Sequence, residues 1–248
     1  MDRVAPPPSS PPPATPTGQR QAWVFGANGL LGRQLLEVLV DAPEYARVTA
    51  VTRRPLGREH PRLANRIVSF DKLDSQLAGL ACHDVYCAIG TTLAQAGSEA
   101  AFRAVDHDVV LRVARLARQL GAERFVLVSA AGADVASKNF YLRTKGETEA
   151  AVAALGFPAL DIVQPGLLLG GERAGSRPLE SVARVLMPLA NPLLGGGLKA
   201  WRGIDVAVLA RAMLGLARSG RRGVHRYTYE ALAKLAAKSG TAPAAAPR

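Results

Sequence analysis

The chain has 248 residues, of which 48% are hydrophobic and 21% charged, and its formal net charge is +11 at pH 7. This composition suits a globular chain with a sizeable core and excludes disorder of the whole chain. No apolar run reaches the ~18–20 residues that cross a bilayer, so we expect no membrane span. A basic surface attracts polyanions. The short pairs Arg53-Arg54 and Arg221-Arg222 lack a surrounding nucleic-acid-binding motif, and we expect no nucleic-acid partner.

The two ends of the chain differ in composition from the rest. Residues 1–20 are rich in proline and are expected to form a disordered tail, with prolines where a secretory signal would need an apolar stretch. Residues 234–248 contain little that would anchor them and are expected to form a flexible tail, which leaves 21–233 as a single domain. Cys82 and Cys87 lie five residues apart in one expected strand, so they point to opposite faces and should not pair. Together these features favour a reducing, cytoplasmic location.

Short apolar strands alternate with amphipathic helices between these ends. Expected strands are 21–26, 47–52, 66–70, 84–88, 125–129, 160–164 and 225–228, and expected helices are 30–40, 73–80, 99–120, 141–155 and 205–218. Gly121 and Gly156 are placed to end two of these helices. Residues 167–203, rich in Gly, Pro and Leu, break the alternation and predict a small substrate-side lobe with an amphipathic helix near 179–189. The pattern predicts an α/β fold with a doubly wound parallel sheet, the Rossmann fold.

A glycine-rich segment joins the first strand to the first helix. The spacing is GxxGxxG, in which Gly26 turns the chain, Gly29 lets backbone amides approach a pyrophosphate and Gly32 lets the helix pack on the strand. The amino terminus of the following helix offers N–H groups to phosphates. Spaced glycines also occur in structural turns, but a strand before them and a helix after them favour a nucleotide site. The expected cofactor contacts in this segment are Gly26, Asn28, Gly29, Leu30, Leu31 and Gly32.

The second strand ends in the pair Arg53-Arg54. An NAD site typically has a carboxylate here, whereas arginine suits the 2′-phosphate of NADP, so we expect NADP(H) rather than NAD(H). Arg33 follows the third glycine and is a candidate second cation; the alternative is that the arginines only solvate a loop. Asp71, after the third strand, is expected to border the adenine pocket. The end of the fourth strand is expected to pass beside the cofactor through Ala88, Ile89 and Gly90.

A second group of polar residues follows the fifth strand. Ser129 ends that strand, and Tyr141 and Lys145 lie four apart at the start of a helix, so they share one face. An ammonium beside a phenol stabilises the phenolate, which can then exchange a proton with a carbonyl or hydroxyl while hydride moves to or from nicotinamide. Lys145 can also hold the nicotinamide ribose, and Ser129 can polarise the substrate oxygen. A YxxxK pattern alone is common on helices, but its place after a glycine loop and a strand-end serine is more specific.

These motifs carry a family resemblance. From about Gln21 to Tyr229 the sequence resembles the atypical, NAD(P)-binding members of the short-chain dehydrogenase/reductase superfamily, and among them the subgroup of the HIV Tat-interacting oxidoreductases and their bacterial relatives. The resemblance rests on GANGLLGR, TRRP, GTTLAQAGSEAAFRAVDHD, VLVSAAGAD, FYLRTKGETE and QPGLLLG. It implies cofactor binding by the matched glycines, catalytic roles for Ser129, Tyr141 and Lys145, and a homodimer paired through helices 99–120 and 138–155. Many extended relatives have an asparagine where this chain reads Val105-Asp106-His107-Asp108, so the resemblance does not imply the proton relay that this asparagine supports.

The sequence therefore predicts an NADP-dependent oxidoreductase that acts on a small carbonyl or alcohol substrate. The rival hypothesis is an NADPH-binding regulatory or protein-interaction module with little or no turnover, and an epimerase or dehydratase using transient hydride transfer is a third. The chain has no HExxH motif or CxxC pair, and we expect no metal site.

Overall fold

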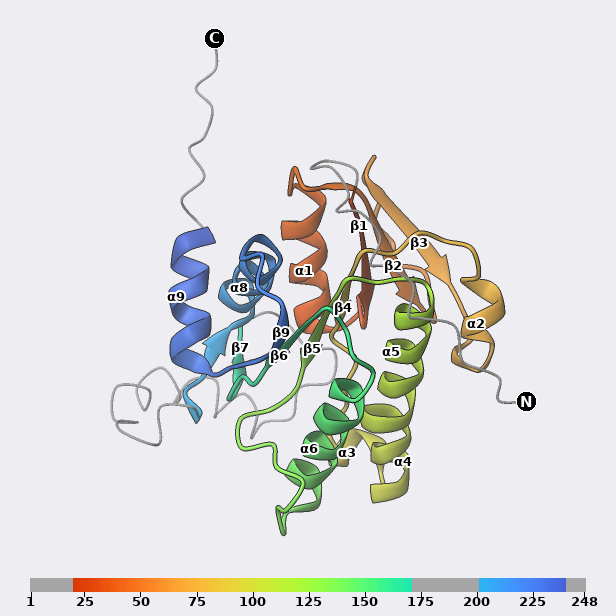
Figure 1. Ribbon diagram of the computed structural model, residues 1–248. Helices are drawn as coiled ribbons and strands as arrows, with labels where there is room; N and C mark the ends of the chain where they lie inside the picture. The colour runs from red at the N-terminus through yellow and green to blue at the C-terminus, as the bar shows by residue number, and fades with distance from the viewer. Residues whose placement is uncertain (1–19, 171–200, 240–248) are drawn as a thin grey trace, which may run out of the picture.

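A seven-stranded parallel sheet forms the centre of the molecule (Figure 1). The computed structural model describes residues 20–170 and 201–239. The strand order is β3-β2-β1-β4-β5-β6-β9, and every neighbouring pair is parallel. The strands are β1 (Arg20–Phe25), β2 (Tyr45–Thr52), β3 (Leu63–Ile67), β4 (Asp84–Cys87), β5 (Arg124–Val128), β6 (Ala159–Val163) and β9 (Gly223–Tyr227). This order confirms the expected Rossmann fold and puts its topological switch point, where ligands bind in such sheets, between β1 and β4.

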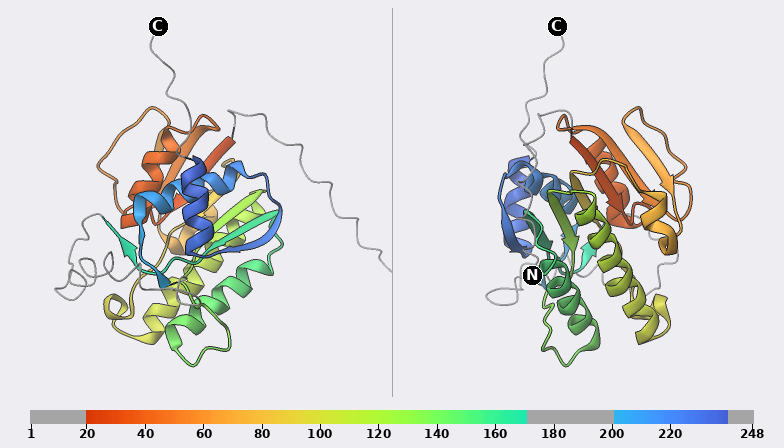
Figure 2. Two further views of the ribbon diagram at one scale, coloured as in Figure 1. Left: turned by 90° about the vertical axis from the view of Figure 1, so that its left-hand side faces the viewer. Right: turned by 45° about the vertical axis from the view of Figure 1, so that its right-hand side comes forward.

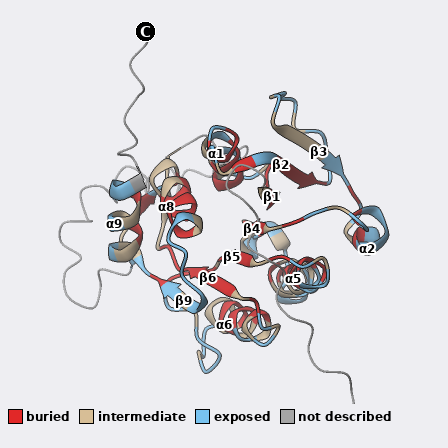
Figure 3. Ribbon diagram, turned by 45° about the horizontal axis from the view of Figure 1, so that its top comes forward, coloured by how far each residue is buried: buried red, intermediate tan, exposed pale blue. Residues whose placement is uncertain are grey.

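Helices cover both faces of the sheet (Figures 2 and 3). One face carries α1 (Leu30–Val40) and α8 (Val206–Arg218), with α9 (Tyr229–Ser239) packed against α8. The other face carries α2 (Leu73–Gln76), α4 (Glu99–Arg103), the π-helical segment η2 (Ala104–Val109), α5 (Val110–Gln119) and α6 (Phe140–Ala153). Alternate residues of β1 divide between the two cores: Ala22 and Val24 face α1 and α8, while Trp23 and Phe25 face the other side. This alternation makes β1 buried throughout its carboxyl-terminal part, as a central parallel strand must be.

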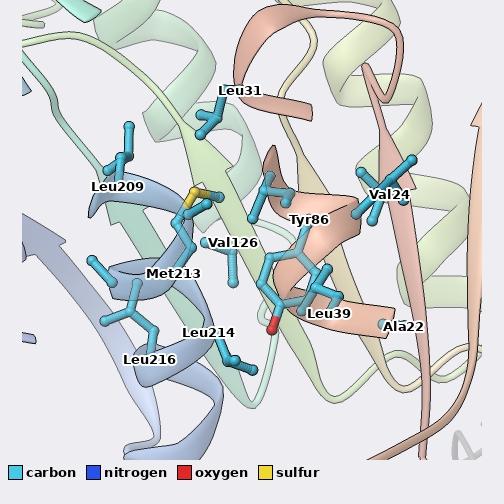
Figure 4. Packing of buried hydrophobic residues seen from close by; sticks show 14 of the residues in the cluster. Ala22, Val24, Leu31, Leu39, Tyr86, Val126, Leu209, Met213, Leu214 and Leu216 are labelled. Carbon is cyan, nitrogen blue, oxygen red and sulfur yellow. The ribbon is translucent and has the colours of Figure 1, made fainter. Parts of the chain in front are cut away.

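The α1–α8 core holds the start of α1 in place (Figure 4). Leu209 and Met213 of α8 are fully buried with Val126 of β5, and Leu31 in the first turn of α1 belongs to the same cluster. Burying one such side chain stabilises the fold by about 1.5–3 kcal/mol. The packing therefore fixes the amino terminus of α1, where the glycine-rich segment lies.

The long helix expected over 99–120 is confirmed as a continuous run, but it is not uniform. The π-helical segment η2 separates α4 from α5, adds a residue to the turn and projects Asp106 into the protein interior. Gly121 and Gly156 follow α5 and α6 with φ values of +83° and +66°, the left-handed conformation expected of helix-ending glycines. Helix 30–40 has the bounds that its periodicity predicts.

The third strand and the helix after it were misplaced by the sequence. The apolar run 66–70 suggested a strand there, but β3 is Leu63–Ile67 and Phe70 already begins the 3₁₀ turn η1 (Phe70–Lys72). β3 is an edge strand with no buried side chain, so its hydrophobic pattern is weak. The helix expected over 73–80 is only α2, which ends at Gln76.

The carboxyl-terminal boundary also differs from expectation. The flexible tail expected from Lys234 was wrong up to Ser239, because α9 continues to that residue. Leu232 and Ala236, one helical turn apart, are buried against α8 and supply the anchor that composition did not reveal. The short strand β7 (Leu168–Leu169), at the start of the expected lobe, pairs in parallel with β8 (Ile204–Asp205), which directly follows that lobe. Most of that lobe and its expected helix, like the proline-rich tail, lie outside the described residues.

The two cysteines are free and buried, as expected. The prediction that they point to opposite faces of one strand was wrong. Cys82 precedes β4 instead of lying in it, and both cysteines face the same core. Burial raises the pKa of the Cys87 thiol to about 12, so this side chain stays protonated near neutral pH. Within residues 20–170 and 201–239, we find no helix with the length and apolar character of a membrane span.

Candidate functional site

The glycine-rich segment forms a tight turn that only glycine permits. Gly26 has φ +79°, and a Cβ there would lie 2.4 Å from the Ala88 carbonyl oxygen. A Cβ on Gly32 would lie 2.2 Å from the Gly26 carbonyl oxygen, so α1 approaches the turn more closely than alanine allows. The Gly29 N–H donates to the Gly26 carbonyl at 2.9 Å. The first turn of α1 is thereby aimed outward with N–H groups that have no acceptor within the helix, an arrangement that binds phosphates.

A cavity of about 850 Å³ opens at the carboxyl ends of β1, β4 and β5. This volume is in the range of small-molecule and cofactor sites. The cavity brings together residues from the glycine segment, the end of β4, the end of β5 and helix α6. The expected site residues that line it are Asn28, Gly29, Leu30, Leu31, Gly32, Arg54, Ala88, Ile89, Gly90, Ser129, Tyr141 and Lys145. Segments more than a hundred residues apart thus form one site at the switch point.

Three expected residues do not line this cavity: Gly26, Arg53 and Asp71. Arg53 lies over the Phe70 ring, 5.7 Å from its centroid. The Asp71 side chain is 95% exposed and faces Arg112 at 3.9 Å. Arg54 and Arg33 do line the cavity, and the Asn28 side-chain amide donates to the Arg54 carbonyl at 3.2 Å, which ties the two loops together. Of the two neighbouring arginines, Arg54 therefore lines the cavity and Arg53 does not.

A buried ion pair holds Lys145. Its Nζ lies 2.6 Å from Oδ1 of Asp106, and both side chains are less than a tenth exposed. The other carboxylate oxygen of Asp106 accepts the Thr91 backbone N–H at 2.8 Å. The π-helical segment η2 shifts the helical register here. The Thr148 hydroxyl donates a hydrogen bond to the backbone carbonyl of Asp106 at 3.0 Å. The π-helical segment thus delivers a carboxylate to the position beside the lysine.

Tyr141 stands one helical turn before Lys145 and lines the same cavity. Its ring packs on Phe102 of α4 with a centroid separation of 5.3 Å. Asn139 caps the helix by accepting the Leu142 N–H, so the turn that carries Tyr141 is fixed at its start. The phenol is therefore held by packing and capping.

Ser129 is bonded to a buried carboxylate behind the cavity wall. Its hydroxyl donates to Oε1 of Glu149 at 2.6 Å. The same oxygen accepts from the Gln164 side-chain amide at 2.8 Å, and Oε2 accepts from Arg226 at 2.9 Å. The Glu149 side chain is 3% exposed, so its charge depends on these donors.

Sequence reasoning missed Glu149 and gave Asp106 no site role. Glu149 follows Lys145 by four residues and Tyr141 by eight, so helical spacing places all three on one face and was an available signal. Asp106 was visible only as the departure from the expected asparagine. Thr91 carried no signal, because its contribution comes from a backbone N–H.

The residues present fit a dinucleotide. One end of the cavity combines the turn that leaves no room for a Cβ at Gly26 or Gly32, the amino terminus of α1 and a basic side chain. Tyr141 and Lys145 lie at the other end. Within residues 20–170 and 201–239, we find no group of three His, Cys, Asp or Glu side chains arranged to hold a metal ion.

The chain belongs to the NAD(P)H-binding family, whose family model matches residues 26–185. Within it, the chain is 36% identical to Protein HTATIP2 of Rattus norvegicus over 199 residues, which are 79% of this chain and 80% of the rat protein. It is also 32% identical to Protein FMP52, mitochondrial, of Coccidioides immitis, across 81% of this chain and 86% of the relative. These relatives confirm the subgroup that the sequence motifs indicated.

The relatives overturn the expected cytoplasmic location. The Coccidioides protein and further fungal relatives from Emericella nidulans and Aspergillus clavatus, at 32–40% identity, all carry the word mitochondrial in their names. The expectation was wrong because it relied on the lack of a secretory signal and on two unpaired cysteines, and neither feature distinguishes the cytoplasm from a mitochondrial compartment.

Solved structures support the fold. WbmH of Bordetella bronchiseptica, solved in complex with NAD+, matches with a TM-score of 0.63 and 14% identity over 84% of this chain and 75% of WbmH. A UDP-galactose 4-epimerase matches with a TM-score of 0.61 and 15% identity over 84% of this chain and 77% of the epimerase. At these identities the likeness concerns the Rossmann architecture alone.

Proposed function

We propose that this protein is an NADP(H)-dependent oxidoreductase that transfers hydride between the nicotinamide and a small carbonyl or alcohol substrate. The observation that carries the proposal is that the glycine turn, Tyr141 and Lys145 line one cavity of about 850 Å³. A cofactor bound through its phosphates at α1 would extend along the end of β4 toward α6. When bound, it supplies or accepts the hydride.

The side chains of α6 would handle the proton. In the direction of reduction, Tyr141 gives its phenolic proton to the carbonyl oxygen as hydride reaches the carbonyl carbon, and in oxidation it takes the proton back. Lys145, held by Asp106, would bind the nicotinamide ribose. Ser129 would contact the substrate from the end of β5.

The preference for NADP(H) is supported by Arg54 and Arg33, which line the cavity near the glycine turn. A guanidinium binds a phosphate by charge and by paired hydrogen bonds, whereas the 2′-hydroxyl of NAD usually requires a carboxylate acceptor. The described residues that line the cavity include no Asp or Glu, which favours the phosphorylated cofactor.

One observation favours the second candidate, a cofactor-binding regulatory module with little turnover. The Asp106 carboxylate neutralises the Lys145 ammonium at 2.6 Å, which weakens the support that this charge gives to a Tyr141 phenolate. The two candidates share the cofactor site and differ only in chemistry.

The test is calorimetry with NADPH and NADH, followed by a screen of aldehydes and ketones for NADPH oxidation. Tyr141→Phe should lower kcat/KM for any active carbonyl by about a hundredfold or more and leave NADPH affinity unchanged, because only the proton donor is lost. Tyr229→Phe, on α9 away from the cavity, is the matched control. Unchanged reduction by Tyr141→Phe contradicts the catalytic assignment, and tight NADPH binding without turnover of any carbonyl favours the regulatory module.

A further inference from the structure

The hydroxyl of Ser129 has a defined direction. A serine hydroxyl has one hydrogen to donate and two lone pairs that accept. In this structure the hydrogen is directed to Oε1 of Glu149, 2.6 Å away. An ionised carboxylate only accepts hydrogen bonds, so Ser129 must be the donor in this pair.

Two further donors are directed at the Glu149 carboxylate, which accepts from both. Gln164, at the end of β6, donates to the same oxygen, and Arg226 of β9 donates to the other oxygen. Three side chains converge on the carboxylate: Ser129 just after β5, Gln164 just after β6 and Arg226 within β9. The arrangement therefore does not depend on a single contact.

Ser129 also lines the cavity beside Tyr141 and Lys145. With its hydrogen spent on Glu149, the side chain offers only lone pairs to a bound substrate. A bare carbonyl oxygen placed against those lone pairs gains no hydrogen bond, which is the opposite of the polarising role that sequence reasoning assigned to this serine.

We propose that Ser129 is a hydrogen-bond acceptor, set by Glu149 and Arg226, and that the substrate carries a hydroxyl or amine donor in addition to its reacting carbonyl or alcohol group. This inference rests on the proposed function and deepens it, because it names the substrate class: a hydroxy- or amino-substituted carbonyl, or the corresponding alcohol. Tyr141 serves the reacting oxygen, and Ser129 accepts from the neighbouring donor. Glu149 and Arg226 are positioning residues that act through Ser129.

The experiment compares two small probes, hydroxyacetone and methoxyacetone, which share a ketone and differ in whether the second oxygen carries a hydrogen. Their dissociation constants are measured by calorimetry on the full chain saturated with NADP+, for the wild type and for Ser129→Ala. The ratio of the dissociation constant of methoxyacetone to that of hydroxyacetone should be about tenfold larger in the wild type than in Ser129→Ala. This factor corresponds to the loss of one hydrogen bond. If Ser129 were a donor, the variant would weaken both ketones equally, and an equal probe ratio in the two proteins overturns the proposal.

Glu149→Gln reverses the direction of the bond. Arg226 should donate to the amide oxygen of the new side chain, so the amide nitrogen faces Ser129. That nitrogen donates to the serine oxygen, and the serine hydrogen can then point into the cavity. The preference for hydroxyacetone over methoxyacetone should then be no larger than in Ser129→Ala. A preference equal to that of the wild type counts against the proposal. If this variant does not fold, neutron diffraction of the wild-type protein with NADP+, exchanged into deuterium oxide, gives the same answer. A deuterium on Ser129 between its oxygen and Glu149 is expected, and one directed into the cavity or bonded to Glu149 overturns the assignment.

The outcomes separate this inference from the function on which it rests. Absence of heat with NADPH and NADP+ in the wild type rejects the proposed function. Retained cofactor binding with an equal probe ratio in wild type and Ser129→Ala rejects only the acceptor role of Ser129.

Discussion

Backbone atoms shape one end of the cavity, and charged side chains shape the other. At the glycine turn, the geometry comes from backbone atoms, with the α1 helix so close that a Cβ at Gly32 would lie 2.2 Å from the Gly26 carbonyl oxygen. At the α6 end, it comes from charged side chains: Lys145 and Asp106 are both buried, and the buried Glu149 is paired with the half-exposed Arg226. Each of these pairs joins segments far apart in the chain.

The difference teaches which part of a site is local. A backbone cradle needs only a few consecutive residues of the right size, so it can be recognised from spacing. A buried charge needs a partner and further hydrogen bonds, and these come from wherever the fold supplies them. The predictions below test whether the two ends depend on these separate physical causes.

The largest effect is expected from Asp106→Ala. Removing one member of a buried ion pair leaves the Lys145 ammonium without its counter-ion and costs about 3–5 kcal/mol of unfolding free energy. Urea unfolding measures the loss. Asp108→Ala is the matched control, since Asp108 lies in the same helix with its side chain 63% exposed, and should change stability by no more than about 0.5 kcal/mol. Equal effects of the two substitutions would mean that the buried pair does not organise this end of the cavity.

Gly32→Ala should destabilise the protein by about 1–3 kcal/mol, because its Cβ meets a backbone oxygen that cannot move freely. In an ordinary helix the same change stabilises by about 1 kcal/mol, so the sign itself is diagnostic. Thermal and urea unfolding give the sign, and calorimetry with NADPH should show weaker binding. Gly29→Ala, whose Cβ would lie 3.1 Å from the same oxygen, is expected to be milder, and a stabilised Gly32→Ala variant would refute the close approach of α1 to the turn.

Arg54→Ala should weaken NADPH binding by about tenfold and leave NADH binding nearly unchanged, since only the phosphorylated cofactor presents a 2′-phosphate to the guanidinium. Titration calorimetry with both cofactors measures the selectivity. Arg53→Ala is the neighbouring control: its guanidinium lies over Phe70 and not along the cavity, so its effect should be smaller. A larger selective loss with Arg53→Ala would reverse the assignment of the two arginines.

The smallest effect is expected from a surface pair that belongs to neither end. Burial opposes ionisation of Glu44, but the hydrogen bond from Arg218 outweighs it and lowers the pKa of that carboxyl below its usual value of 4.5. A lowered pKa in the folded protein means that the pair stabilises above about pH 4.5 and that this contribution is lost as the pH falls further. Because both side chains are partly exposed, the contribution should stay below about 1 kcal/mol.

Glu44→Gln checks this sign. Between about pH 5 and pH 3, the wild type should lose slightly more unfolding free energy than the variant, as measured by urea unfolding at each pH. An identical decline in both proteins would show that the surface pair contributes nothing, and would widen the contrast with the buried pair of Lys145.

Much of the fold and the cofactor end of the site was accessible from the sequence. Helix 30–40, the central strands and the glycine segment follow from periodicity and residue size, which are local properties. Edge strand β3 was misplaced because its side chains are only partly buried and leave little pattern. Asp71 was placed from its order along the sheet, and Arg53 from its position at the end of the second strand. The structure puts both outside the cavity lining, because the directions of their side chains depend on tertiary neighbours.

The sequence by itself determined that β1 would be followed by a turn only glycine can make, since Gly26 and Gly32 differ from every other residue in lacking a Cβ. It also placed Tyr141, Lys145 and Glu149 on one face of a helix, because helical spacing is fixed. Only the tertiary structure decided that Asp106 meets Lys145 and that Glu149 takes the hydrogen of Ser129. These contacts depend on a π-helical segment and on strands β5, β6 and β9 lying side by side, and buried charges are stable only where such distant partners converge.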